Sequence, residues 1–125
     1  MYIIEKDYAK RRLVFLLDRY QDHDRPQFQR DVKDSALKVK GRHDHFDILA
    51  DFSNSMVMPR AIADDSEDIA TWLVENGLRR SANISRSVTQ RMQIRRVTDH
   101  DARFAMFATR EEGERWLDRQ AALEN

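Results

Sequence analysis

The chain of 125 residues contains no cysteine, only two prolines and only three glycines. The absence of cysteine excludes disulfides, thiolate zinc sites and cysteine nucleophiles, and it is compatible with the cytoplasm, where we expect the protein to be. The scarcity of proline and glycine argues against long loops. The sequence therefore predicts a chain made mostly of regular helices and strands.

Long hydrophobic runs are also missing. The longest near the N-terminus is Leu13–Leu17, five residues between Arg11-Arg12 and Asp18-Arg19. A signal peptide needs about 7–15 apolar residues and a membrane helix about 20. The run predicts a buried strand, and we expect no targeting segment and no integral membrane segment.

The chain has no net charge, because 22 basic residues balance 22 acidic ones. With 41% hydrophobic residues it is too apolar for a disordered tail, and its length suits one domain covering residues 1–125. No glycine-rich phosphate loop, Gly-x-Ser-x-Gly elbow or His-Glu-x-x-His helix occurs. We therefore expect a protein that is not an enzyme and that has no cofactor.

Two periodicities alternate along the sequence. Strands are expected at residues 2–5, 12–20, 46–52 and 103–108, with a weak one at 82–84, and helices from about residues 26, 64–66, 87 and 109. The residues expected on the inward helix faces are Phe28, Val32, Ala36 and Val39; Ile69, Trp72 and Leu73; Val88, Met92, Ile94 and Val97; and Trp116 and Leu117. This order predicts an α/β fold with a mixed, mostly parallel sheet of about four or five strands, an N-terminal hairpin and about four helices.

The ends of two expected strands carry a family resemblance. One strand ends in Asp51-Phe52-Ser53, and the last feeds a capping box at Thr109–Glu112 and then the pair Trp116-Leu117. This pattern resembles the bacterial SpoIIAA-like (STAS-like) domains, in which a final strand leads into a helix whose aromatic-leucine pair packs on the sheet. The resemblance implies a STAS-like fold and a regulatory role through protein contacts.

The resemblance also implies a phosphorylatable serine where a strand meets a helix. Ser53 and Ser55 occupy the matching stretch, but the family's glycine is absent and Pro59 delays the expected helix to about residue 64. A phosphate gains from free N–H groups at a helix start, so Ser53 and Ser55 form at most a vestigial phosphosite. The alternative is that both serines serve as turn and capping residues.

Six arginines and no acid lie between Asn76 and Thr98, directly after the acidic stretch 64–68. Arg86, Arg91, Arg95 and Arg96 are the candidates for binding an anion or an acidic partner, because guanidinium groups suit carboxylates and phosphates. Alternatively they pair with the acids at 64–68. Aromatic residues do not interleave with the arginines, so we do not expect nucleic acid as a partner.

Two further clusters have competing interpretations. Phe52, Met56 and Met58 could line a groove for an amphiphilic ligand, or they could pack in the core or in a homodimer interface. His43-Asp44-His45-Asp47 has metal-ligand chemistry, with His23 or His100 as a third ligand, but a solvated loop is the simpler account and we expect no metal.

The sequence therefore favours a non-catalytic regulatory or protein-interaction module, acting on a protein partner or as a homodimer. The alternative is a binding domain for a small anionic or amphiphilic (lipid-like) molecule.

Overall fold

A computed structural model describes residues 2–18, 25–54 and 60–124, without the side chains of residues 25 and 60–66. The described residues form five strands and four helices: β1 (Tyr2–Asp7), β2 (Arg12–Asp18), α1 (Arg25–Lys40), β3 (Phe46–Asn54), α2 (Arg60–Glu75), β4 (Leu78–Ile84), α3 (Val88–Val97), β5 (Phe104–Phe107) and α4 (Arg110–Glu124).

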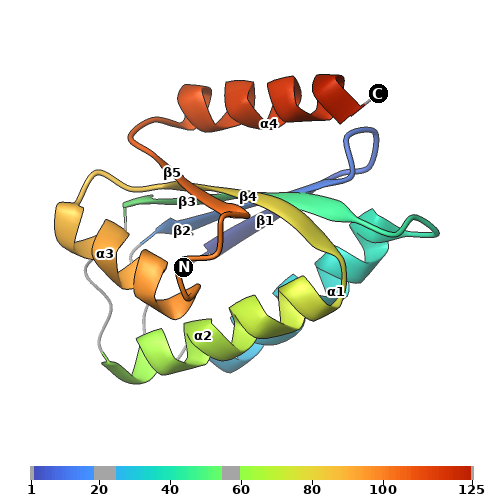
Figure 1. Cartoon of the computed structure of the whole chain (residues 1–125). Coiled ribbons are helices and arrows are strands. Elements are labelled where there is room, and N and C mark those ends of the chain that lie inside the picture. The colour runs from blue at the N-terminus through green and yellow to red at the C-terminus, as the bar shows by residue number, and fades with distance from the viewer. Residues whose placement is uncertain (1, 19–24, 55–59, 125) are drawn as a thin grey trace.

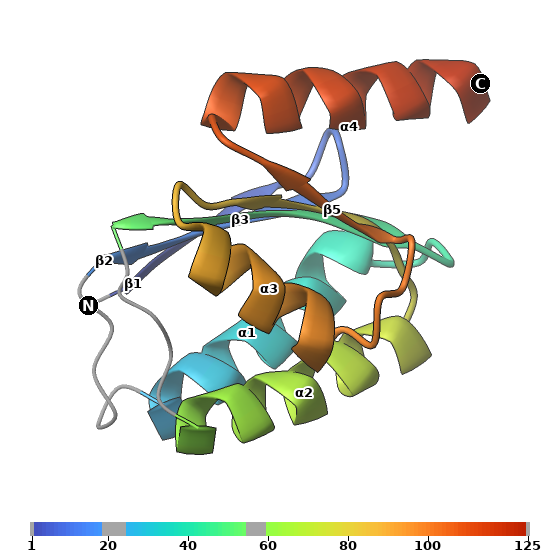
Figure 2. The same cartoon turned by 60° about the vertical axis from the view of Figure 1, so that its left-hand side comes forward.

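The strands form one sheet in the order β1-β2-β3-β4-β5. The β1–β2 hairpin is antiparallel, and each later pair is parallel. Helices α1, α2 and α3 cover one face, while α4 lies alone on the other (Figures 1 and 2). The predicted α/β class with a mixed sheet is confirmed. None of the helices in the described ranges is long and apolar enough to cross a membrane.

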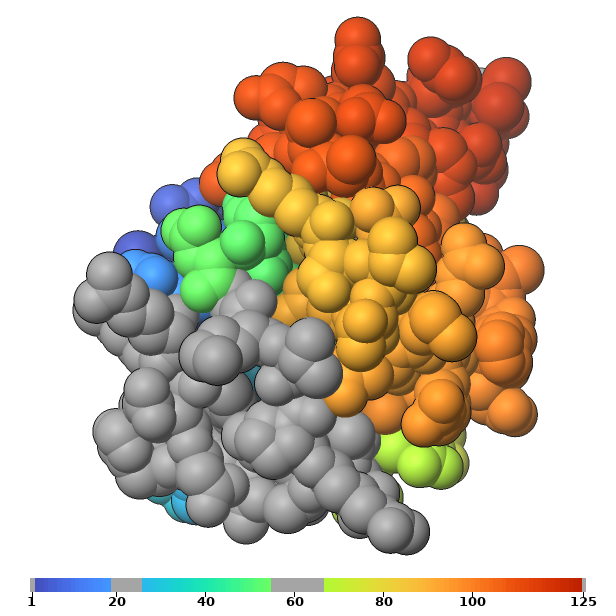
Figure 3. All heavy atoms as spheres, turned by 90° about the vertical axis from the view of Figure 1, so that its left-hand side faces the viewer, coloured from blue at the N-terminus to red at the C-terminus, as the bar shows by residue number. Residues whose placement is uncertain are grey.

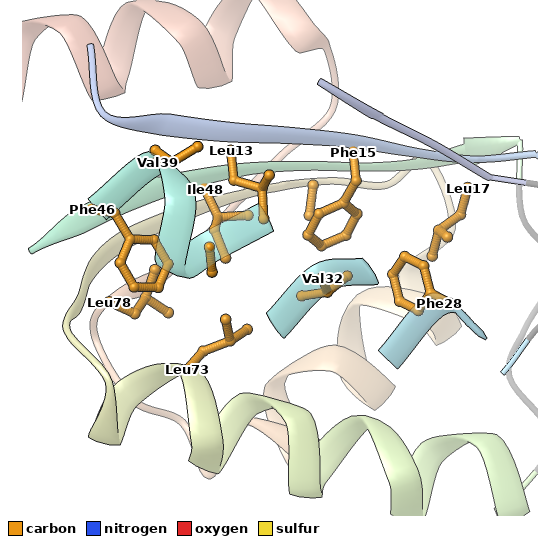
Figure 4. Close-up of a cluster of buried hydrophobic side chains, with 12 residues drawn as sticks. Leu13, Phe15, Leu17, Phe28, Val32, Val39, Phe46, Ile48, Leu73 and Leu78 are labelled. Atoms are coloured by element: carbon orange, nitrogen blue, oxygen red, sulfur yellow. The ribbon is translucent and has the colours of Figure 1, made fainter. Parts of the chain in front are cut away.

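The larger core lies between the sheet and the helices α1 and α2 (Figure 4). The stripe expected on α1 is buried throughout, and Phe28 packs edge-on against Phe15 of β2 with ring centroids 5.5 Å apart. Phe46 and Ile48 of β3 and Leu73 of α2 complete the same cluster. The helical spacing of α1 therefore identified its inward face correctly, because one apolar stripe on that helix meets one apolar sheet face.

A smaller core fixes α4 to the opposite face. Leu117 is completely buried and packs with Leu49 of β3 and with Ala82 and Ile84 of β4. Gly113 allows the close approach, because a Cβ atom at this position would lie 2.7 Å from Cδ1 of Ile84. Trp116 is only half-buried, so the expected core pair consists of one core residue and one residue at its edge.

The capping interaction before α4 is present in altered form. The hydroxyl oxygen of Thr109 accepts a hydrogen bond from the backbone N–H of Glu112 at 3.3 Å. The Glu112 carboxylate, however, accepts from the Thr109 hydroxyl at 2.9 Å instead of from a backbone N–H. Thr109 therefore caps the helix as expected, and Glu112 orients the cap.

Three of the boundaries that differ from the sequence predictions affect the candidate site residues. Helix α2 begins at Arg60, so its first turn contains none of the acids expected at its start. Strand β3 continues to Asn54, which places Ser53 in the strand and not in a turn. Strand β4 begins at Leu78 and includes the first two arginines of the basic block.

Candidate functional site

Helix α3 presents a different face to the core than its apolar residues indicate. Its buried residues are Gln90 and Ile94, one turn apart. Val88 and Met92 are 69% and 59% exposed, so their expected inward placement is wrong. Two apolar side chains one turn apart therefore lie together on the exposed face of α3.

Hydrogen bonds explain this orientation. The hydroxyl of Ser85, at the end of β4, is fully buried and donates to the side-chain oxygen of Gln90. Ser87 caps the helix by accepting from the backbone N–H of Gln90 at 3.2 Å. A buried amide must be satisfied, and these contacts fix the rotation of α3 about its axis.

Four arginines surround the exposed apolar pair. Arg86 precedes α3, and Arg91, Arg95 and Arg96 lie on it; Arg91 is half-buried and the others are exposed. Within the described part of the chain, none of the four makes an ion pair or a side-chain hydrogen bond, and Glu67 and Asp68 of α2 do not contact them in this way. We define Val88, Met92, Arg91, Arg95 and Arg96 as the α3 surface; helix α3 is on the side of the molecule that faces the viewer in Figure 3.

The other two arginines of the block lie on the opposite side of the sheet. Arg79 donates to both carboxylate oxygens of Asp47, at 3.3 and 3.1 Å, and Arg80 donates to Oδ2 at 3.3 Å. Glu124 of α4 pairs with both arginines and lies 3.1 Å from Nη1 of Arg80. The basic block therefore divides into two arginines that are paired internally and four that make no ion pair with a described residue.

Asp47 belongs to a row of alternating charge across four strands. The register pairs Asp7 with Arg12, Arg12 with Asp47, and Asp47 with Arg80. Residues paired in this way project from the same face of a sheet, which here is the face beneath α4. We call Asp7, Arg12, Asp47 and Arg80 the charged row. Helix α4 contacts both arginines of this row: Asp118 accepts a hydrogen bond from Arg12 at 2.7 Å, and Glu124 pairs with Arg80.

The predicted histidine cluster does not assemble into a ligand set. His43 and Asp44 are exposed in the loop before β3, whereas Asp47 is buried and bound by arginines. Burial, together with Arg79 and Arg11, lowers the pKa of His45. Across residues 2–18, 25–54 and 60–124, no three histidine or acidic side chains come close enough to hold a metal ion. His23 lies outside the described residues, and His100 is exposed.

The residues expected at a phosphosite or groove are only partly described. Ser53 is half-buried, and both its backbone N–H, at 2.9 Å, and its hydroxyl donate to Oδ1 of Asp51. Phe52 packs edge-on against Phe15 at 6.2 Å. Ser55, Met56 and Met58 lie outside the described residues, so the groove stays a prediction.

Sequence reasoning missed a polar layer between β4 and α3. Ser81, Asn83, Ser85 and Gln90 are all buried, and Asn83 donates to the backbone oxygen of Ala105 at 3.2 Å. The signal was the alternation of polar residues at positions 81, 83 and 85, which is typical of a strand with one polar face. The layer holds β4, β5 and α3 together with directional contacts.

Comparison with known proteins does not place the chain in a family: no protein-family model and no curated protein matches the sequence. The resemblance to SpoIIAA-like domains therefore stays a prediction based on the element order and on the closing strand and helix.

Proposed function

We propose that the protein is a non-catalytic interaction module, resembling the cytoplasmic STAS-like domains, and that it binds an acidic protein partner through the α3 surface. The observation that carries this proposal is the exposure of Val88 and Met92 beside arginines that have no acidic partner within the described chain.

The composition of the α3 surface suits a protein interface. Methionine and arginine are enriched in the buried centres of such interfaces, and the other charged residues are depleted there. Val88, Met92 and Arg95 follow one another at spacings of four and three residues, so they share one helical face. The apolar centre and cationic border of the α3 surface are complementary to a partner surface that has an apolar patch bordered by carboxylates.

The charge of the α3 surface also favours an acidic partner over a neutral one. No acid occurs between Asn76 and Thr98, so nearby carboxylates in sequence do not cancel the field of the α3 arginines. Unpaired guanidinium groups attract carboxylates before contact and accelerate association, and salt screens this attraction within about 8 Å at physiological ionic strength.

Site-specific photocrosslinking in the native host tests the proposal. A photoreactive residue replaces Met92, and the control position is Leu37, which is 48% exposed on α1. We expect a discrete adduct from position 92 whose contact segment is acidic, with no equivalent adduct from position 37. Equal adducts from both positions, or an adduct formed only with a second copy of the chain, would contradict the proposal.

Paired arginine replacements supply the matched control. Arg91→Gln with Arg95→Gln should weaken the adduct and its salt dependence while leaving the thermal midpoint near wild type. Arg115→Gln with Arg119→Gln, an exposed pair with the same spacing on α4, should do neither. A double replacement in α3 that lowers stability and leaves the adduct intact would assign the arginines a structural role instead.

A further inference from the structure

A groove of about 410 Å³ lies on the sheet face that carries α4. Strands β1 and β2 form its floor, and α4 and the hairpin turn form its walls. The charged residues that line it are Glu5, Lys6, Asp7, Lys10, Arg12, Arg110 and Glu114. The groove is remote from the α3 surface, because α3 covers the opposite face of the sheet (Figure 2).

Arg12 and Lys10 place two cationic side chains at one end of the groove. The side chain of Arg12, only 6% exposed, donates from Nη2 to Asp118, but its buried Nε–H has no acceptor. A buried donor without an acceptor costs free energy, so a ligand oxygen that reached it would be favoured. The Lys10 ammonium, about half exposed at the rim, adds a second positive charge at 3.3 Å from Asp118.

Carboxylates make the rest of the groove unsuitable for a simple anion. Glu5 is exposed on the groove floor and makes no hydrogen bond or ion pair with any described residue, while Glu114 pairs with Arg110 at 3.0 Å. Glu5 pairs in register with Val14, which places it diagonally across the hairpin from Arg12. The Cα atoms of diagonal neighbours are about 7–8 Å apart, so the groove presents a carboxylate without an ion pair to any described residue on the strand next to the Arg12 guanidinium.

We propose that this groove binds a small zwitterion, with a carboxylate at Arg12 and Lys10 and an ammonium group at Glu5. A linear amino acid or short peptide whose two charges are several bonds apart has the required chemistry. The ligand's ammonium group relieves the repulsion that Glu5 imposes on an anion, and its carboxylate supplies the acceptor that Arg12 lacks. This site does not depend on the interaction proposed for α3.

The test is a titration followed by ¹H–¹⁵N NMR with three probes of equal chain length: 6-aminohexanoate, hexanoate and hexylamine. We expect 6-aminohexanoate to shift the amide signals of residues 5–14 and 110–114. It should bind about fivefold more tightly than either singly charged probe, which is the upper end of what one partly exposed ion pair supplies. Equal binding of hexanoate, or shifts located elsewhere, would overturn the proposal.

Two variants identify the cation contact. Glu5→Gln should reduce binding of 6-aminohexanoate to the level of hexanoate, while Glu111→Gln, an exposed acid on α4 outside the groove lining, should leave both unchanged. If 6-aminohexanoate retains its advantage in Glu5→Gln, or if wild-type protein shows no shifts at saturating probe, the groove is not a zwitterion site.

Discussion

Replacement of Asp47 by asparagine tests the charged row most directly. The Asp47 carboxylate is 1% exposed and is the acceptor for both Arg79 and Arg80. Arg79 is 24% exposed and can turn toward water, but Arg80 is 8% exposed and cannot do so without moving α4. The substitution therefore leaves one buried guanidinium with Glu124 as its remaining charged partner.

Breaking a buried ion pair by removing one partner costs about 3–5 kcal/mol. Because asparagine keeps one acceptor oxygen and Glu124 remains, we expect Asp47→Asn to cost about 3 kcal/mol, at the low end of that range. At this chain length the loss corresponds to a decrease of about 12 °C in the thermal midpoint. With a urea slope of about 2 kcal/mol/M, the urea midpoint should decrease by about 1.5 M.

Urea denaturation followed by circular dichroism measures this loss without adding salt. The matched control is Asp34→Asn, which breaks the exposed pair with Lys38 on α1 and should leave the urea midpoint close to that of the wild type, because water screens exposed ion pairs. Asp47→Leu combined with Arg80→Met, which replaces the buried pair with apolar groups, should recover most of the stability. If Asp47→Asn costs no more than Asp34→Asn, the charged row is solvated and the reasoning is wrong.

Three further predictions test other parts of the fold. Leu117→Ala should cost about 2–5 kcal/mol in urea denaturation, and Trp116→Ala should cost less because its ring is only half-buried; the reverse order would show that α4 docks differently. The pKa of His45 is lowered on folding. The contribution of His45 to the free energy of unfolding is therefore fully present above the unfolded pKa of about 6.5 and decreases as the pH falls toward the folded pKa. His45→Gln should flatten that decrease in thermal melts between about pH 7 and pH 5. Gly77→Ala should lower the thermal midpoint more than Gly41→Ala. A Cβ atom at Gly77, where φ is +108°, would lie 2.6 Å from a backbone oxygen, whereas the atom nearest to a Cβ at Gly41 is 3.9 Å away.

The parts of the fold that the sequence predicted correctly depend on local patterns. Apolar side chains are buried at helical spacing in the stripe from Phe28 to Val39 and at strand spacing in the run Leu13–Leu17. Periodicity alone therefore identifies both segments. The capping residue Thr109 is similarly local. Such signals need no knowledge of which elements become neighbours.

The residues that were placed wrongly depend on neighbours that are distant in sequence or on buried polar contacts. Val88 and Met92 are exposed because Gln90 finds a buried hydrogen-bond partner in Ser85, and hydrophobicity gives no indication of that preference. The sequence shows Arg80 only as part of a basic block without nearby acids, because its acidic neighbours, Asp47 and Glu124, are 33 and 44 positions away. Register across the sheet brings these charges together, and a single sequence does not reveal register.

The position of α4 alone on its face has a consequence for the order in which the protein folds during synthesis. Every strand leaves the ribosome before α4 does, and α1, α2 and α3 can already cover the other face. At about 5–20 residues per second, the 15 residues of α4 take roughly 1–3 s to follow. During that interval Leu49, Ile84 and the arginines beneath α4 face water or whatever binds nascent chains. A protein whose translation stops before α4 would keep this half-apolar, half-cationic face open, and such truncated chains should aggregate or be held by chaperones.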